Sequence, residues 1–380
     1  MQYCDFKGCK VSALGMGCMR LPVIDGADDK VDEPAAKRMI DYAMEQGVTY
    51  YDTAWGYHGG HSEEVVGRCL AGYPRDSFSL ASKFPGYDVA NFGKVEQIFT
   101  RQLEKCQVDY FDFYLCHNVC ELNIEQYLDD ERYHTVSYLA GEREAGRIRH
   151  LGFSVHGDFD TFMRFLDCYG EQMEFCQIQL NWMDWGFQEA RRKVEVCRDR
   201  GLPVVVMEPL RGGALVDLAE PYRQRLAALR PDAAPVEWAL DYLMGIPEVM
   251  TVLTGASNFE QLKQNIAIFN DPRPTTAAEN QELYAIAADM KSSIGVPCTA
   301  CHYCTSHCPQ ELDIPGLLRL YNQNLSTKGF DFIAPMAVDA MAPEKKPSAC
   351  IACRACEQVC PQQIKISEVL ADFSSRLGLK

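Results

Sequence analysis

The sequence lacks the features that mark membrane-spanning, exported and nucleic-acid-binding proteins. No apolar run reaches the ~18 residues that a transmembrane helix needs, so we expect no membrane partner. The segment Met1–Lys10 is largely polar and charged and has no apolar stretch of signal-peptide length, which predicts a cytoplasmic protein. Basic residues are outnumbered, 37 against 53 acidic ones for a net charge of −16. This balance argues against nucleic acid as a partner.

The chain of 380 residues is too long for one hydrophobic core, since such cores seldom grow beyond ~250–300 residues. Short β-rich runs alternate with amphipathic helical stretches up to about residue 270, whereas the chain beyond about residue 294 shows little β pattern. We therefore expect two domains, residues 1–280 and 281–380. The predicted strands are Ser12–Gly17, Thr49–Thr53, Phe78–Lys83, Phe111–His117, Ile148–Ser154, Phe175–Asn181, Pro203–Glu208 and Met250–Thr254.

Eight strand–helix units predict a parallel sheet, and eight units suffice to close a (β/α)8 TIM barrel. An open doubly wound sheet is the alternative. Dinucleotide-binding folds of that kind typically carry a G-x-G-x-x-G motif after the first strand, and this sequence has none there. One intervening helix is predicted over Arg132–Ala145, where apolar residues recur three to four apart. The predicted fold class is thus α/β, with a C-terminal, mainly helical domain after the barrel.

Cysteine is abundant, with 18 residues, and two runs of four lie near the C-terminus. Both runs have the spacing C-x2-C-x2-C-x3-C-P, which is that of bacterial ferredoxins with two 4Fe–4S clusters, where the fourth cysteine of each run binds the other cluster. Zinc is the weaker alternative, because it favours two C-x2-C pairs. The spacer of residues 309–349 resembles the helical two-cluster modules of larger redox enzymes. The predicted ligand sets are Cys298, Cys301, Cys304 and Cys360 for one cluster, and Cys350, Cys353, Cys356 and Cys308 for the other.

Two segments, at the opening of the predicted barrel and after its second strand begins, carry a family resemblance. Residues 11–20 read VSALGMGCMR, and residues 51–57 read YDTAWGY. Both resemble the aldo-keto reductase family, and with the cysteine runs the chain resembles its ferredoxin-fused subgroup. The resemblance covers about residues 8 to 270. It implies a TIM barrel and four catalytic positions, which here are Asp52, Tyr57, Lys83 and His117.

The four side chains also make chemical sense together, because all end or follow predicted strands, where barrel enzymes keep their active sites. Hydride reduction of a carbonyl leaves an alkoxide, which the Tyr57 hydroxyl can protonate. A nearby Lys83 ammonium is expected to lower the tyrosine pKa from its usual ~10, with Asp52 as counter-charge. His117 is expected to donate to the carbonyl oxygen and orient it.

The resemblance also implies a nicotinamide cofactor. Ser154 and Gln177 match the positions that hold the carboxamide, and Met207 stands where the family often stacks an aromatic ring. Val155 replaces the asparagine that is common in the family beside Ser154. Ser257 is expected to bond a 2′-phosphate, which favours NADP(H), with NAD(H) as the alternative. The other expected contacts are Pro209, Leu210 and Gly212 at the pyrophosphate, and Gly255, Gln261 and Asn265 at the adenosine end.

Further side chains are expected in loops at the same barrel end. Three histidines are candidates for lining a substrate pocket or, as a weaker alternative, for binding a metal, and three aromatic residues either shape the pocket or simply pack. These residues are His58, His61 and His156, and Tyr87, Trp182 and Trp185.

Three functions remain open on these grounds. The first is NAD(P)H-dependent interconversion of a carbonyl and an alcohol on a small molecule. In this case the clusters have a structural, docking or sensing role and take no part in hydride transfer. The second is electron transfer, in which the clusters exchange electrons with substrate or with a ferredoxin- or flavin-type redox partner. The third is a nucleotide-binding redox sensor, which would have no need of Tyr57. The intact set of four catalytic positions favours the first.

Overall fold

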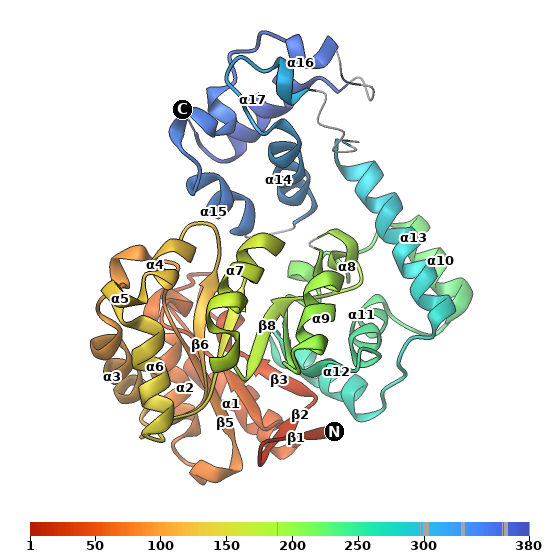
Figure 1. Ribbon diagram of the computed structural model, residues 1–380. Coiled ribbons are helices and arrows are strands. Elements are labelled where there is room, and N and C mark those ends of the chain that lie inside the picture. The colour runs from red at the N-terminus through yellow and green to blue at the C-terminus, as the bar shows by residue number, and fades with distance from the viewer. Residues whose placement is uncertain are drawn as a thin grey trace. The chain divides into compact units, whose positions relative to one another are not determined.

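The computed structural model describes residues 1–187, 189–296, 298, 304–327, 331–358, 360 and 364–379. The chain forms two compact units. The first comprises Met1–Leu210 and Asp232–Asn280, and the second comprises Arg211–Pro231 and Gln281–Lys380. The second unit therefore takes a segment from the middle of the chain as well as the C-terminal residues (Figure 1).

Eight parallel strands of the first unit close into a barrel in the order β10-β3-β4-β5-β6-β7-β8-β9. Every predicted strand is present, so the predicted (β/α)8 barrel is confirmed. Strands β5 and β6 are buried at every residue, as parallel strands covered by helices should be. The bounds are β3 Leu14–Gly17, β4 Tyr50–Asp52, β5 Ser79–Phe84, β6 Phe111–Val119, β7 Ile148–Val155, β8 Phe175–Gln179, β9 Val204–Met207 and β10 Val249–Thr254.

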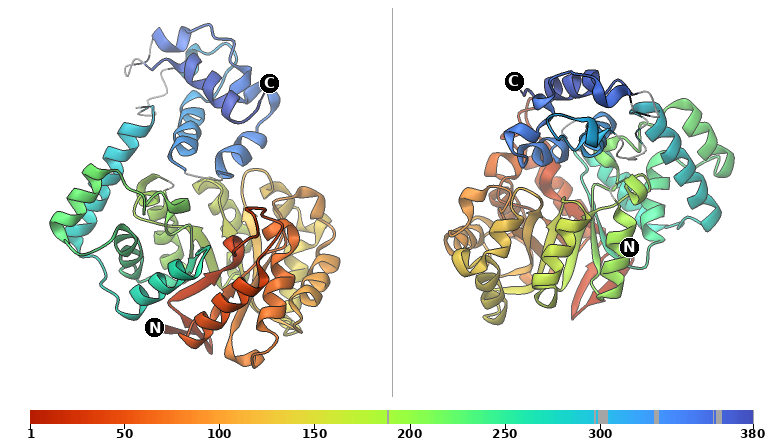
Figure 2. Two further views of the ribbon diagram at one scale, coloured as in Figure 1. Left: turned by 180° about the vertical axis from the view of Figure 1, so that it is seen from behind. Right: turned by 45° about the horizontal axis from the view of Figure 1, so that its top comes forward.

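Helices surround the barrel and cover the outer face of its strands (Figures 1 and 2). In the first of them, Met39, Ile40 and Ala43 are buried, at the spacing of one helical face. The Asp32 side chain caps its start. The bounds are α1 Glu33–Glu45, α2 Ser62–Leu70, α3 Val95–Cys106, α4 Ile124–Leu128, α5 Asp130–Tyr133, α6 Thr135–Glu144, α7 Phe159–Tyr169, α8 Asp184–Phe187, α9 Ala190–Asp199, α11 Pro235–Met244 and α12 Phe259–Asn270.

An antiparallel hairpin that the sequence analysis did not predict precedes the barrel. It consists of β1 (Tyr3–Phe6) and β2 (Cys9–Ser12). The connecting residues Lys7 and Gly8 both have positive φ, 50° and 88°, as the favoured two-residue turn between twisted strands requires. Phe6 and its neighbours pack against buried residues of the barrel. The hairpin thus covers the end of the barrel at which the barrel strands begin.

The second unit is mainly helical where it is described. Its larger apolar cluster combines leucine and isoleucine side chains of α14 and α17 with cysteines of both runs. The smaller cluster joins Tyr321 of α14 to Phe373 of α17, with ring centroids 5.7 Å apart. The bounds are α10 Glu220–Leu229, α13 Ala277–Ile294, which begins in the first unit, α14 Ile314–Ser326, α15 Ile333–Asp339, α16 Ala355–Gln358 and α17 Ile366–Arg376.

A buried arginine fixes the mid-chain segment within the second unit. Arg211 is 1% exposed and donates to the carbonyl oxygen of Ser326 at 3.0 Å and to Gln323 Oε1 at 2.8 Å, both on α14. Arg225 of α10 pairs with Glu282 of α13 at 2.6 Å. Residues 211–231 therefore fold with helices that follow much later in the chain.

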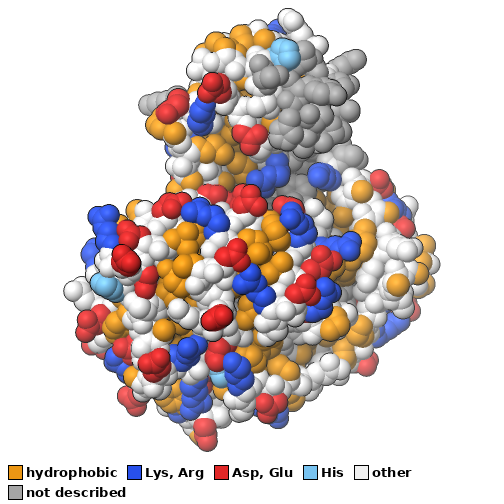
Figure 3. All heavy atoms as spheres, in the orientation of Figure 1, with side chains coloured by type: hydrophobic (Ala, Val, Ile, Leu, Met, Phe, Trp, Pro, Cys, Tyr) orange, Lys and Arg blue, Asp and Glu red, His pale blue; other side chains and the backbone are white. Residues whose placement is uncertain are grey.

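On the face drawn in Figure 3, acidic and basic side chains are interspersed over the barrel unit. Several pair along helix surfaces, as Arg191 does with Glu195 at 2.8 Å. Over the described ranges, no helix combines the length and the apolar character that crossing a bilayer requires.

Candidate functional site

The four expected catalytic residues lie at the C-terminal ends of neighbouring barrel strands. Asp52 is the last residue of β4, and Tyr57 opens a short turn after it. Lys83 lies near the end of β5, and His117 lies near the end of β6. Because β4, β5 and β6 are parallel neighbours, their ends bring these side chains to one side of the barrel.

Lys83 is the centre of the site. Its side chain is fully buried, and Nζ donates to Asp52 Oδ1 at 2.7 Å and to the Thr53 carbonyl oxygen at 2.6 Å. The Tyr57 hydroxyl lies 3.5 Å from the same Nζ. Burial raises the pKa of Asp52, and the Lys83 charge offsets part of that effect. The buried ammonium therefore has a carboxylate and a carbonyl as partners, as a buried charge requires.

Tyr57 differs from the sequence-based expectation in its proton affinity. Burial, reinforced by the Asp52 charge, raises the pKa of Tyr57 well above its ordinary value. The expected lowering by Lys83 is therefore wrong, since the ammonium directs its shorter hydrogen bonds to Asp52 and Thr53. Tyr57 consequently keeps its proton at neutral pH and can act as a proton donor.

His117 faces Tyr57 as a neutral imidazole. The two rings meet edge to face with centroids 6.1 Å apart. Burial, and then the Lys83 charge, hold the pKa of His117 well below its usual value. Within the described part of the chain, buried Nδ1 of His117 has no hydrogen-bond partner. A neutral imidazole has one N–H donor, which can donate a hydrogen bond to an oxygen atom of a ligand.

Tyr87 lines the same site. Its ring lies edge-on to His117 with centroids 5.4 Å apart. Its hydroxyl sits against Gly56, where an added Cβ would lie only 2.3 Å away. Any larger residue at position 56 would therefore displace Tyr87 from the neighbourhood of Tyr57. Trp182, by contrast, is 1% exposed and belongs to the core.

The residues expected to hold the carboxamide are adjacent and fit an amide. Ser154 and Gln177 are register partners on β7 and β8, and both are buried. Gln177 Nε2 lies 3.7 Å from Met207 Sδ, whereas its Oε1 is a buried acceptor without a partner among the described residues. Such an acceptor suits the NH2 group of a carboxamide. Ser154 Oγ accepts a hydrogen bond from the Asn118 backbone NH at 2.8 Å. Part of its hydrogen-bonding capacity is therefore already used within the protein.

The expected pyrophosphate loop follows β9. Pro209 and Leu210 are the last residues of the first unit before Arg211, and Gly212 follows in the second unit. Gly212 and Gly213 have φ values of 62° and 91°, which only glycine adopts readily. The loop therefore has the backbone conformations through which amide groups can approach an anion.

The expected adenosine end follows β10. Ser257 and Gln261 are exposed, and the Ser257 backbone NH donates to Gln261 Oε1 at 2.8 Å. Asn265 is buried and donates to Thr254 Oγ1 at 2.7 Å. This hydrogen bond ties α12 to the end of β10. Gly255 lies beside Arg20, whose Cδ would be 3.3 Å from an added Cβ. Arg20 belongs to the motif of residues 11–20 but was not among the expected contacts, and it pairs with Glu208 at 3.3 Å.

The three loop histidines do not come together as a metal site. His58 Nε2 accepts from the Leu21 backbone NH at 3.0 Å, so this buried ring supports a loop. Burial lowers the pKa of His156 to about 3. Over the described ranges, no three His, Cys, Asp or Glu side chains could hold one metal ion. This finding covers single ions, whereas cysteines around an iron–sulfur cube bind separate corners.

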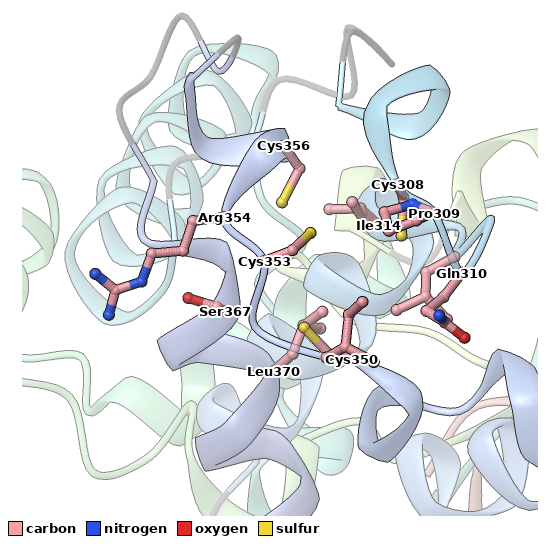
Figure 4. Close-up of a pocket in the computed structure, with 12 residues that line it drawn as sticks. Cys308, Pro309, Gln310, Ile314, Cys350, Cys353, Arg354, Cys356, Ser367 and Leu370 are labelled. Atoms are coloured by element: carbon pink, nitrogen blue, oxygen red, sulfur yellow. The ribbon is translucent and has the colours of Figure 1, made fainter.

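One predicted cysteine set surrounds a cavity in the second unit. Cys308, Cys350, Cys353 and Cys356 all line it (Figure 4). They come from different segments, since Cys308 precedes α14 whereas the others lie before and within α16. Around Cys353 the chain is exposed, and Ile351 is 59% exposed. Of the other predicted set, Cys298, Cys304 and Cys360 are described, and Cys301 lies outside the described residues.

Two family models match the sequence. The model of the aldo/keto reductase family covers residues 13–287, and that of the 4Fe-4S dicluster domain covers residues 297–364. Among similar proteins, a probable aldo-keto reductase 1 of Glycine max is 26% identical, over 68% of this chain and 81% of its own. The L-galactose dehydrogenase of Arabidopsis thaliana is 24% identical, over 68% and 85%.

Solved structures resemble the barrel part of the chain. An aldo-keto reductase from Bacillus halodurans, in its holo form, superimposes with a TM-score of 0.60 at 26% identity. The match covers 75% of this chain and 96% of that one. An aldo/keto reductase from Klebsiella pneumoniae, in complex with NADP and acetate, gives 0.59 at 21% identity over 74% and 93%.

Proposed function

Because the chain belongs to the aldo/keto reductase family and carries a 4Fe-4S dicluster domain, we propose that it interconverts a carbonyl and an alcohol by hydride transfer with NAD(P)H. The observation that carries this proposal is the buried Asp52–Lys83 pair, with the half-buried Tyr57 hydroxyl 3.5 Å from Lys83 Nζ and its ring beside His117. Tyr57 is a protonated hydroxyl at the edge of this group, next to a neutral imidazole. The substrate is a small molecule with an aldehyde, ketone or alcohol group.

In the reducing direction, His117 orients the carbonyl oxygen, and Tyr57 protonates the oxygen as negative charge develops there. Lys83 holds its positive charge 3.5 Å from the Tyr57 hydroxyl, which offsets part of the burial penalty on the tyrosinate that proton loss leaves. Asp52 holds Lys83 in place through the 2.7 Å bond. The nicotinamide supplies the hydride when it is bound. In the oxidising direction the Tyr57 side chain must first lose its proton, and the tyrosinate then takes the proton from the alcohol.

Ser154 and Gln177 would hold the carboxamide, with Met207 packing beside it. Pro209, Leu210 and Gly212 would lie along the pyrophosphate. We propose NADPH over NADH, because Ser257 is exposed just before α12 and the guanidinium of Arg20, which pairs with Glu208 at 3.3 Å, belongs to a side chain beside Gly255. The remaining adenosine contacts would come from Gly255, Gln261 and Asn265.

The test is anaerobic turnover with NADPH or NADH and a panel of small aldehydes and ketones. The variant Tyr57→Phe should lower kcat by ~10²–10⁴-fold, whereas its nucleotide dissociation constant should stay near that of the wild type. Trp185→Phe is a matched aromatic control in α8, where the Trp185 ring lies edge-on to Tyr242, and it should keep kcat within severalfold. Full activity of Tyr57→Phe would contradict the proposal.

Electron transfer is the second candidate, and the cysteine-lined cavity supports it. A cluster bound by Cys350, Cys353, Cys356 and Cys308 would lie beside the exposed residue Ile351, where a ferredoxin- or flavin-type partner could approach. Cys298, Cys301, Cys304 and Cys360 would bind the other cluster, within residues 281–380. Nicotinamide delivers two electrons together and each cluster takes one, so this route needs a further carrier or a radical-tolerant substrate. Bleaching of the clusters by NADPH alone would favour it.

A further inference from the structure

A second group of nucleophilic and titratable side chains lies at the barrel end opposite Lys83. Cys9 is the first residue of β2, His150 lies near the start of β7, and Glu174 directly precedes β8. These are N-terminal strand positions, whereas the residues described above occupy C-terminal ones. At the usual rise per residue, the distance along β7 from His150 to Ser154 is roughly 13 Å.

The three side chains form one chain of hydrogen bonds. Cys9 Sγ lies 3.4 Å from His150 Nε2, and His150 Nδ1 lies 2.8 Å from Glu174 Oε2. Lys7 donates to the other oxygen of the Glu174 carboxylate at 2.6 Å. A carboxylate beside Nδ1 places the imidazole proton there and leaves Nε2 as the acceptor that faces the thiol. A nucleophile, a base and a group that orients the base therefore stand in sequence.

Packing and backbone geometry hold this arrangement in place. His150 is 6% exposed, and its ring is flanked by Phe6 and Phe113 with centroids 4.8 and 5.1 Å away. The two-residue turn of the hairpin directs Lys7 to Glu174, and Cys9 follows that turn directly. The group is therefore built by the hairpin and two barrel strands.

Cys9 differs from most barrel cysteines in being partly exposed. Burial and the Asp112 charge raise the pKa of Cys9, and the Arg149 guanidinium offsets part of this effect. At rest Cys9 is therefore a thiol next to His150, and it becomes a thiolate as His150 accepts its proton. Other barrel cysteines are buried from solvent, namely Cys18, Cys69, Cys106, Cys116, Cys120, Cys176 and Cys197.

We propose that Cys9, His150 and Glu174 form a thiol-exchange site at which Cys9 reacts with low-molecular-weight disulfides. Cys9 Sγ attacks one sulfur of the disulfide while its proton passes to His150 Nε2. A sulfur–sulfur bond forms to Cys9, the bond within the reagent breaks, and the departing thiolate takes the proton from His150. Cys9 is thereby oxidised and half of the disulfide is reduced to a thiol. The disulfide is the only oxidant that the step needs.

This reaction is independent of hydride transfer at Lys83. A group attached to Cys9 would enter the contact between the hairpin and the barrel, because Cys9 packs against that buried cluster. The expected consequence is a loosened hairpin and a lower unfolding temperature, with the catalytic strand ends unaltered.

The probe is oxidised glutathione, added anaerobically to the holoprotein, and peptide mass spectrometry follows each cysteine over time. Cys168 is the internal reference, because it is exposed and hydrogen-bonded to Tyr169. Cys9 should be glutathionylated faster than Cys168. His150→Gln should slow the Cys9 reaction by about 10²-fold, the lower end of what a general base contributes. The Cys168 rate in the same sample should not change.

Glu174→Gln is the second variant, since it keeps the shape of the side chain and removes the charge that holds the imidazole. It should slow Cys9 by a smaller factor, with the circular dichroism spectrum unchanged. If His150→Gln fails to fold, Glu174→Gln decides the question. Equal rates at Cys9 and Cys168, or a Cys9 rate unaffected by either folded variant, would overturn the proposal.

Discussion

At the scale of single residues, buried charge is the main physical constraint on the site. Lys83 Nζ is out of contact with water, and its hydrogen bonds to Asp52 and Thr53 replace that contact. Removal of one partner of a buried ion pair leaves the other charge uncompensated, whereas removal of both charges does not. The pair therefore matters for stability as well as for chemistry.

Asp52→Asn should lower the free energy of unfolding of the barrel by about 3 kcal/mol, measured by denaturant titration of tryptophan fluorescence. The double variant Asp52→Asn, Lys83→Met should be more stable than the single variant, because no unpaired charge remains. Glu33→Gln is the control, since it breaks a half-exposed pair with Arg68 and should change stability by at most about 1 kcal/mol. A double variant less stable than Asp52→Asn would contradict this reasoning.

Carbonyl reduction should be insensitive to pH through the neutral range. The pKa of Tyr57 is raised above its ordinary ~10 and that of His117 is lowered below its ordinary ~6.5. Tyr57 therefore stays protonated and His117 stays neutral between these two ordinary values. The log of kcat for reduction should be flat from about pH 6.5 to about pH 9. A titration near neutrality that disappears in Tyr57→Phe would show that Lys83 lowers the Tyr57 pKa after all.

Residue positions were predictable from the sequence where strand ends fixed them. The positions of Asp52, Lys83 and His117 at strand ends follow from the β–α alternation. The proton affinity of Tyr57 did not follow, because it depends on burial and on where Lys83 directs its hydrogen bonds. Arg20 was missed for a similar reason, since only the closed barrel brings β3 next to β10 and Arg20 next to Gly255.

At the scale of elements, helix α14 organises the second unit through Arg211. The guanidinium bonds occur near the end of α14, on a carbonyl and a side-chain amide that are both buried. Without Arg211 these acceptors would stay out of water and lose a donor, which is costly for buried polar groups.

Arg211→Ala should destabilise the second unit by about 1–3 kcal/mol, seen as loss of cluster absorbance at lower denaturant concentration. Arg225→Ala is the matched control, because its partners Glu282 and Asp289 are partly exposed. Such pairs contribute at most about 1 kcal/mol. Equal effects of the two variants would show that the buried contacts of Arg211 do not support the unit.

Elements departed most from the sequence pattern at one predicted helix and at the N-terminal hairpin. The predicted helix Arg132–Ala145 is interrupted at His134, whose φ is 51°, so that α5 and α6 are separate. The Asp130 side chain accepts from the Val136 and Ser137 backbone NH groups and thereby caps α6, which hydrophobic periodicity does not reveal. The hairpin was missed because β1 and β2 are short, and half-exposed strands of four residues give a weak alternation signal.

At the scale of the whole molecule, the cysteines of both runs are part of a core. Cys304 and Cys356 are buried in the larger apolar cluster of the second unit, with Leu317 and Leu370. Clusters bound there would link the segment before α14 to the segment around α16. Their binding energy would therefore add to the folding energy of this unit. The barrel has its own closed core and does not need them.

Cluster removal should therefore unfold the second unit alone. All four tryptophans belong to the barrel unit, so tryptophan fluorescence reports on the barrel. Treatment with an iron chelator and ferricyanide should reduce far-ultraviolet circular dichroism, while the denaturant midpoint of the fluorescence stays constant. A large fall in that midpoint would mean that the barrel depends on the clusters.

Hydride transfer at the barrel site can be followed together with the redox state of the clusters in one reaction. The anaerobic holoprotein is mixed with NADPH and a reactive small aldehyde, and nucleotide oxidation, alcohol formation and cluster absorbance are recorded together. We predict one alcohol formed for each NADPH oxidised, clusters that stay in their starting redox state, and a rate that falls ~10²–10⁴-fold in Tyr57→Phe. Bleaching of the clusters by NADPH without alcohol formation, or an unchanged rate in Tyr57→Phe, would contradict the claim.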